Sequence, residues 1–161
     1  MNITVLCVGK LKEKYWVEAV DEYTKRLSRF CRLTLTQVPE KRLPDKAGFA
    51  EEQTVIEAEG QALMQKLQSG TSTYVIALDI KGKQLTSNEL AEKISKLALD
   101  GKSDIVFIIG GSLGLSEELL MRADSKLSFS KMTFPHQLMR PLLLEQIYRA
   151  CKINANEAYH K

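Results

Sequence analysis

The run Ile105-Val106-Phe107-Ile108-Ile109 is followed directly by Gly110-Gly111-Ser112-Leu113-Gly114. A short, continuous apolar run that ends at glycines is typical of a strand buried on both faces, and glycines let the backbone turn sharply or approach a ligand closely. In open α/β sheets, ligands bind at the carboxyl ends of the strands. This stretch therefore predicts a small-molecule site, with an ordinary strand-to-helix turn as the alternative.

Strands and helices alternate on both sides of this run. Strands are expected at 2–8, near 33–35, at 74–80, 105–109 and 126–130, and helices at 16–30, 56–67, from 86, from about 116 and up to about 153. The segment Lys81-Gly82-Lys83 is expected to turn away from its strand, and Pro141 predicts a kink or a late helix start near Arg140. The alternation predicts an α/β fold with a mostly parallel sheet and helices on both faces.

Length and composition limit the protein class. The chain has 161 residues and is 44% hydrophobic, which predicts a single domain spanning residues 1–161. No stretch approaches the roughly 18 apolar residues of a membrane span, and Asn2 to Val8 lacks the features of a signal peptide, so a cytoplasmic protein without membrane contact is expected. Three widely spaced cysteines and two histidines predict neither a disulfide framework nor a metal site.

The net charge of +3 is small, but basic residues gather near the amino end. Lys10, Lys12 and Lys14 precede a predicted helix that carries three more cations, Lys25, Arg26 and Arg29. Nucleic-acid binders show such clustered basic faces. Solvated faces of amphipathic helices give the same pattern, and both interpretations remain open.

Several familiar motifs are incomplete. Gly101-Lys102-Ser103 resembles the end of a phosphate-binding loop, but Lys96 stands where that motif needs glycine. The Gly110 loop lacks the glycines of a dinucleotide fingerprint at positions 112 and 115, and no Gly-x-Ser-x-Gly elbow is present. Kinase-like, standard nicotinamide and hydrolase chemistry are therefore disfavoured.

Three strand ends remain as site candidates: Leu78-Asp79-Ile80, the Gly110 loop, and the segment Phe129-Ser130-Lys131-Met132-Thr133-Phe134-Pro135-His136. The third combines aromatic rings, a thioether, hydroxyls and a cation immediately before a helix. Such a lining suits a ligand that has an aromatic base and a few hydrogen-bonding atoms.

The chain resembles the ribosomal RNA large-subunit methyltransferase H family, within the SPOUT class of knotted methyltransferases. The motifs that carry the resemblance run from end to end: Val8-Gly9-Lys10-Leu11-Lys12, Ile109-Gly110-Gly111-Ser112, Leu127 to His136, and Glu157-Ala158-Tyr159-His160-Lys161. Leu113 and Pro141 depart from the residue types expected in the family.

The resemblance implies a fold, a cofactor and an activity. It implies a carboxyl-terminal trefoil knot, which general topology rules alone disfavour. It also implies methyl transfer from S-adenosylmethionine to N3 of a pseudouridine in 23S ribosomal RNA, carried out by a homodimer on the assembled ribosome. Carried over by motif, the expected cofactor-binding residues are Leu78, Gly110, Phe129, Ser130, Lys131, Met132, Thr133 and Phe134.

The resemblance places the remaining chemistry in the carboxyl-terminal tail. The acceptor N3 must lose its imide proton, so His160 is expected as the general base. Tyr159 is expected to stack on the substrate base, and Lys161 to pair with phosphate or stabilise the imide anion. Arg140 is a candidate phosphate ligand or a structural arginine, and His136 a substrate contact or a helix-start residue.

Two further classes of function compete with the enzyme. One is a catalytically inactive, ribosome-associated binding protein of the same fold, and the other is a nucleotide-binding oxidoreductase, which the missing glycine fingerprint weakens. The intact Gly110 loop and tail favour the methyltransferase.

Overall fold

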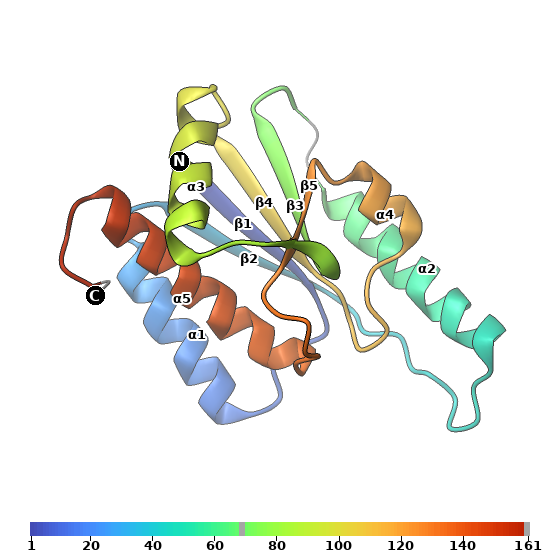
Figure 1. The fold of residues 1–161 in the computed structure, drawn as a ribbon. Coiled ribbons are helices and arrows are strands. Elements are labelled where there is room, and N and C mark those ends of the chain that lie inside the picture. The colour runs from blue at the N-terminus through green and yellow to red at the C-terminus, as the bar shows by residue number, and fades with distance from the viewer. Residues whose placement is uncertain (68–69, 160–161) are drawn as a thin grey trace.

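The computed structural model describes residues 1–67 and 70–159. Ten elements follow one another along the chain (Figure 1). They are β1 (Asn2–Val8), α1 (Lys14–Leu27), β2 (Arg32–Val38), α2 (Phe49–Lys66), β3 (Thr73–Gln84), α3 (Ser87–Leu99), β4 (Asp104–Ile109), α4 (Glu117–Arg122), β5 (Ser125–Ser128) and α5 (His136–Asn154).

The strands form one five-stranded sheet in the order β2-β1-β4-β3-β5, and every neighbouring pair is parallel. The predicted parallel α/β sheet is therefore confirmed. Because all five strands run the same way, their carboxyl ends lie at one edge of the sheet, where ligands of such folds bind.

Helices cover both faces of the sheet, as predicted. Alternate residues of a strand point to opposite faces, and in β4 Ile105, Phe107 and Ile109 join one core cluster while Val106 and Ile108 join the other. The first cluster also takes buried residues from α1, α3 and α5, and the second takes them from α2 and α4. The central strands are thus apolar on both sides.

The turn expected at Lys81 to Lys83 lies inside β3, which bends there and continues to Gln84. Its pairing with β5 shifts within the strand, so that Leu78 and Lys83 both stand opposite Leu127. A β-carbon on Gly82 would lie 2.7 Å from the backbone nitrogen of Leu127. The glycine allows two backbones to pass in contact where the strand bends. Figure 1 shows the end of β3 crossing β5 at this point. The trefoil knot itself stays a prediction.

The late start expected for the last helix is wrong. The helix begins at His136, four residues before Arg140, and contains Pro141. Proline lacks an N–H, so the carbonyl of Gln137 loses its helical partner, but one such loss near a helix start leaves the rest of the ladder intact. Among the described residues, no helix is long and apolar enough to span a membrane.

Candidate active site

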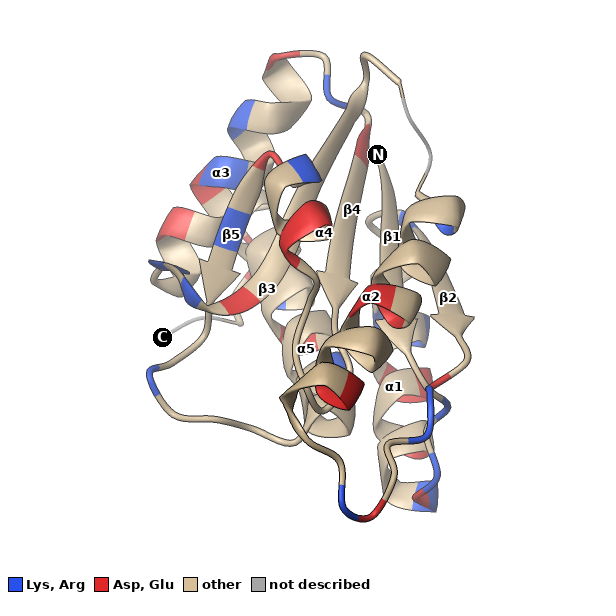
Figure 2. Cartoon of the chain, turned by 90° about the vertical axis from the view of Figure 1, so that its right-hand side faces the viewer, with Lys and Arg blue, Asp and Glu red and all other residues tan. Residues whose placement is uncertain are grey.

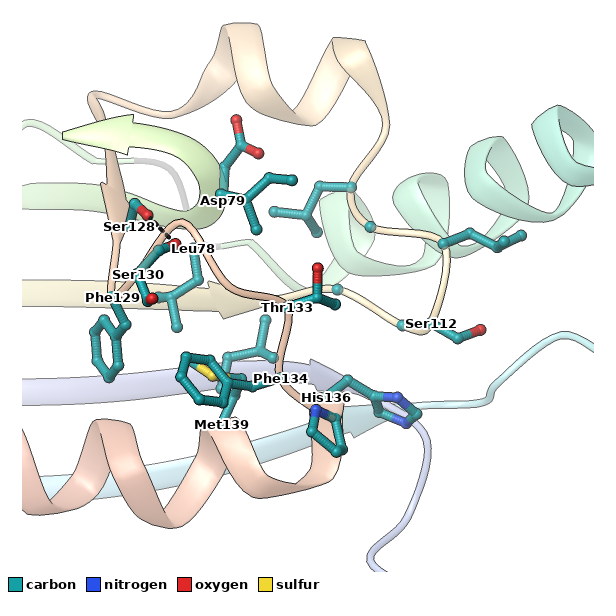
Figure 3. Close-up of a pocket in the computed structure, with 18 of the residues that line it drawn as sticks. Leu78, Asp79, Ser112, Ser128, Phe129, Ser130, Thr133, Phe134, His136 and Met139 are labelled. Atoms are coloured by element: carbon teal, nitrogen blue, oxygen red, sulfur yellow. Dashed lines mark hydrogen bonds between the residues drawn. The ribbon is translucent and has the colours of Figure 1, made fainter. Parts of the chain in front are cut away.

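The bend of β3 at Leu78 to Ile80 and the carboxyl ends of β4 and β5 surround one pocket of about 700 Å³ (Figure 3). This volume lies within the range of small-molecule sites, about 300–1,000 Å³. The three strand ends singled out in the sequence therefore meet. The pocket is lined by Leu78, Asp79, Ile80, Ile109, Gly110, Gly111, Ser112, Leu113, Gly114, Leu115, Leu127, Ser128, Phe129, Ser130, Met132, Thr133, Phe134, Pro135, His136 and Met139.

Seven of the eight expected cofactor residues line this pocket: Leu78, Gly110, Phe129, Ser130, Met132, Thr133 and Phe134. Lys131 lies in the same loop, but it is exposed and is not one of the lining residues. The structure thus brings together most of the set, and the role of each residue stays a prediction.

The wall after β4 depends on closely approaching backbones. A β-carbon on Gly110 would lie 2.6 Å from the carbonyl oxygen of Gly114, and Gly114 itself has a φ of +88°. Gly111 and Gly114 form an isolated bridge that closes the loop. The loop then enters α4, where the Ser116 hydroxyl accepts a hydrogen bond from the Leu119 N–H. This glycine content, visible in the sequence, fixes the shape of the wall.

The wall after β5 is held by its own serines. The Ser128 hydroxyl donates to the Ser130 carbonyl at 2.9 Å, and the Ser130 hydroxyl accepts from the Met132 N–H at 3.0 Å. These local bonds hold the loop while the side chains of Met132 and Phe134 stay 72% and 37% exposed. The mouth of the pocket therefore presents apolar side chains against which a planar ring can stack.

Only two titratable side chains occur among the described lining residues, Asp79 and His136. One oxygen of the Asp79 carboxylate accepts from the Lys81 N–H at 3.3 Å. Burial lowers the pKa of His136 from its ordinary 6.5; Arg140 and Lys12 act in the same direction, and Glu40 in the opposite one. The imidazole at the pocket wall is therefore neutral near pH 7 and able to accept a proton.

Arg140 lies in the interior, 2% exposed. Its Nη2 donates to the carbonyls of Val8 at 2.6 Å and Gly9 at 2.7 Å, where β1 ends. Its Nε and Nη1 are buried without a hydrogen-bond partner. This placement fits the structural alternative, since a phosphate would reach the guanidinium only after the surrounding chain moved. A substrate contact by Arg140 stays a prediction.

The described end of the tail folds back on α5. The Tyr159 hydroxyl donates to Glu145 Oε1 at 3.3 Å, and its ring lies edge-on to Tyr148, at 4.9 Å, and over the Arg149 guanidinium, at 4.8 Å. His160 and Lys161, the expected base and its basic neighbour, lie outside the described residues. The structure thus places the tail up to Tyr159 and leaves the roles of all three residues as predictions.

One residue near the pocket was missed in the sequence. Glu59 in α2 is 4% exposed, and its Oε1 accepts from the Lys41 N–H at 2.9 Å. Burial raises the pKa of its carboxyl, and the Lys41 bond opposes that shift. Glu59 lies at helical spacing between Ile56 and Leu63, and a charge on that apolar face was the available signal.

Within the described ranges, no group of three His, Cys, Asp or Glu side chains could hold a metal ion. The expectation of a metal-free protein stays a prediction. The donor set of the pocket consists of backbone groups, hydroxyls, one carboxylate and one imidazole, which suits an organic ligand.

Comparison with known proteins first gives the class. The family described as predicted SPOUT methyltransferase matches residues 1–160. Among solved structures, a probable methylase family protein from Haemophilus influenzae Rd KW20 has a TM-score of 0.54 and 15% identity, covering 99% of this chain and 70% of its own. That likeness supports the fold.

The relatives then give the family. Proteins called ribosomal RNA large subunit methyltransferase H from Clostridium novyi (strain NT) and Alkaliphilus oremlandii (strain OhILAs) are 58% and 55% identical to this chain, each over the full length of both proteins. The chain belongs to the ribosomal RNA large subunit methyltransferase H family of SPOUT methyltransferases.

Proposed function

We propose that this protein is a metal-free, cytoplasmic methyltransferase that uses S-adenosylmethionine to methylate N3 of a pseudouridine in 23S ribosomal RNA. The observation that carries the proposal is the pocket at three strand ends, lined by seven of the residues that match the family motif. Its full-length relatives carry a name that specifies methylation of large-subunit ribosomal RNA.

The pocket fits the proposed methyl donor. Its volume of about 700 Å³ accommodates a nucleoside with an amino-acid chain. Phe129, Met132 and Phe134 offer apolar and aromatic surface to an adenine, while the Gly110 and Ser130 backbones offer hydrogen bonds. When bound, S-adenosylmethionine supplies an electrophilic methyl group on a sulfonium. The task of the chain is then to hold the acceptor nitrogen in line with it.

The acceptor is a weakly acidic imide, so a base must take its proton. A positioned base contributes about 10²–10⁴ in rate. We assign this step to His160, with Tyr159 stacking on the base and Lys161 stabilising the anion. His136 is the second candidate, because it lies in the pocket wall with a lowered pKa. Variants of the two histidines separate these roles.

The position of Tyr159 supports a dimer. Tyr148, which Tyr159 contacts, follows the pocket residue Met139 by nine residues of α5, a rise of about 14 Å along the helix. Two more residues of extended chain beyond Tyr159 span at most about 7 Å, which is less than this rise. Figure 1 shows the described end of the chain beside α1, away from the loop that leads into α5. A tail docked in this way serves the pocket of a second copy better than its own, so we infer a homodimer in which tails are exchanged.

The ribosome is the proposed form of the substrate. A net charge of +3 gives one small protomer weak attraction for isolated RNA, whereas a dimer gains contacts on a shaped ribosomal surface. Protein-free 23S RNA should therefore be a poor substrate. Equal turnover on protein-free RNA and on ribosomes would exclude this part of the proposal.

Calorimetric titration separates the enzyme from an inactive binding protein of the same fold. The protein is titrated with S-adenosylmethionine, and Gly110→Ala serves as the matched variant because its added β-carbon meets the Gly114 carbonyl at 2.6 Å. We expect saturable binding by the wild type and much weaker binding by the variant. No binding by the folded wild type would remove the methyltransferase proposal and leave the inactive binding protein.

A further inference from the structure

Six cations follow β1 and β2, next to the pocket: five stand on the two loops, and Lys14 is the first residue of α1. They are Lys10, Lys12, Lys14, Lys41, Arg42 and Lys46, here called the basic shelf, and all six are exposed. Because the sheet is parallel, these loops leave the same edge at which the pocket opens. Figure 2 shows blue segments at the lower end of the molecule, where β2 ends and the loop into α2 begins.

Backbone contacts hold both loops in place. The Lys12 N–H donates to the Gln137 side chain at 3.2 Å, which ties the first loop to the start of α5. The Lys41 N–H donates to the buried Glu59 carboxylate at 2.9 Å, which ties the second loop to α2. Both bonds use main-chain donors and leave the two ammonium groups out; the exposed Lys12 ammonium also forms an ion pair with Glu40 at 3.8 Å.

The same anchors lie against the pocket. Gln137 follows His136, a lining residue, and the charges of Lys12 and Glu40 both act on the His136 imidazole. The other Glu59 oxygen lies 2.7 Å from the position of a β-carbon on Gly111, which also lines the pocket. The shelf therefore borders the pocket and is fixed relative to it.

The charge of the shelf is concentrated. Residues 9–14 and 39–48 contain these six cations and three carboxylates, Glu13, Glu40 and Asp45, a net charge of +3. The whole chain also has a net charge of +3, so the rest of the molecule is neutral overall. A cationic surface beside a pocket for a methyl donor matches a strand of RNA, whose phosphates flank the base that is brought to the donor.

A second basic region fits this role less well. The groove between α3 and β5 holds Lys83, Lys93, Lys96 and Lys126 together with Glu89 and Glu92. Its Lys93 ammonium donates to the Ser125 hydroxyl at 3.0 Å and lies over the Tyr74 ring. The groove has four lysines and two carboxylates, a net charge of +2 against +3 for the shelf, where Lys12 and Lys14 form ion pairs with Glu40 and Glu18.

We propose that the basic shelf binds RNA phosphates that flank the target nucleotide and so orients the acceptor base toward the pocket. The inference rests on the proposed function and adds the surface that holds the substrate. Phosphate contacts of this kind position a nucleic acid without reading its sequence. Shelf residues should therefore affect substrate binding and leave methyl-donor binding unchanged.

The test compares two doubly substituted proteins with the wild type. Lys41→Ala/Arg42→Ala removes two shelf charges and keeps the Lys41 N–H bond to Glu59, and Lys96→Ala/Lys126→Ala removes two charges from the other groove as the matched control. Three quantities are measured: the KM for ribosomal large subunits between 50 and 200 mM salt, the Kd for S-adenosylmethionine, and the oligomeric state by light scattering.

We expect the shelf variant to raise KM about tenfold near 150 mM salt and to reduce the slope of log KM against log salt by about 1.4, as for two lost phosphate contacts to single-stranded RNA. Donor affinity and oligomeric state should match the wild type, and the control should keep the wild-type KM. An unchanged KM and salt slope in the shelf variant, or equal shifts of KM in both variants, would overturn the proposal that the basic shelf binds RNA. Either result leaves the proposed function standing if the wild type binds the donor and methylates ribosomes.

Discussion

The carboxylate of Glu59 lies against the backbone of Gly111: a β-carbon at Gly111 would be 2.7 Å from Glu59 Oε2. The Glu59 side chain has little freedom to withdraw, because it is 4% exposed and its other oxygen accepts from the Lys41 N–H. One buried side chain thus supports the pocket loop on one side and the β2–α2 loop on the other.

Gly111→Ala is expected to destabilise the fold by about 1–3 kcal/mol, the usual effect of overpacking, and to weaken binding of S-adenosylmethionine. The check is urea unfolding together with calorimetry. In a Glu59→Ala background the added methyl has space, so the same substitution should be much milder there. If the changes in unfolding free energy of the two single variants add up to that of the double variant within about 0.5 kcal/mol, the two residues are not coupled.

Gly82→Ala is expected to lower the free energy of unfolding by about 3 kcal/mol or more, at the upper end of overpacking effects. The new β-carbon would meet backbone atoms of Lys126 and Leu127 at 2.7–2.8 Å, and a backbone cannot turn aside as a side chain can. Gly70→Ala is the control, since its β-carbon would have ordinary contacts of 3.5 Å and beyond. Equal stability of the two variants would refute the close crossing of β3 and β5.

Arg140→Leu is expected to destabilise by about 1–3 kcal/mol for each of the two carbonyls that lose their donor. Arg140→Lys should recover part of this loss, because an ammonium can also donate to Val8 and Gly9. Chemical unfolding gives the comparison. A variant with wild-type stability and a raised KM for ribosomes would instead support the phosphate-binding role.

Acidification is expected to weaken the fold partly through His136. Its pKa in the folded protein lies below the ordinary 6.5, so the unfolded chain takes up the proton first. The contribution to stability is therefore complete above pH 6.5 and is lost as pH falls from 6.5 through the folded pKa. Urea midpoints at pH 7.5 and pH 5 should differ less in His136→Gln than in the wild type. An equal difference between the two midpoints in the wild type and in His136→Gln would show that His136 is not the source of the acid sensitivity.

His160→Ala is expected to lower turnover on ribosomes by about 10²–10⁴, the usual contribution of a positioned base, with an unchanged Kd for S-adenosylmethionine. Mixing this variant with Gly110→Ala should restore part of the activity, because a mixed dimer pairs an intact pocket with the intact tail of the other copy. Unchanged turnover of the single variant would remove the tail from the chemistry. Failure of the mixture would place tail and pocket in the same protomer.

Local patterns predicted most of the fold and of the pocket. The apolar run 105–109 is a central strand, and its side chains alternate between the core clusters on the two faces of the sheet. The helix expected from residue 86 is α3, and the Thr86 hydroxyl caps it by accepting from the Glu89 N–H. Such features depend on residues that are close together in the sequence, so they can be recognised from the sequence alone.

Long-range contacts account for what local patterns could not decide. Gly82 has the composition of a turn, and only the distant backbone of Leu127 shows why glycine is needed there. The sequence left two roles open for Arg140, and only its hydrogen bonds to Val8 and Gly9, more than 130 residues away, favour the structural one. The role of Glu59 in supporting the pocket depends on the contact between its carboxylate and Gly111, which lies far away in the sequence.

The most direct test of the account is mass-spectrometric mapping of 23S RNA after ribosomes that lack the modification are incubated with this protein and S-adenosylmethionine carrying a labelled methyl group. The account predicts one labelled methyl, on N3 of a single pseudouridine, and none with the Gly110→Ala variant. Label on another base, or no label with protein that binds the donor, would contradict it.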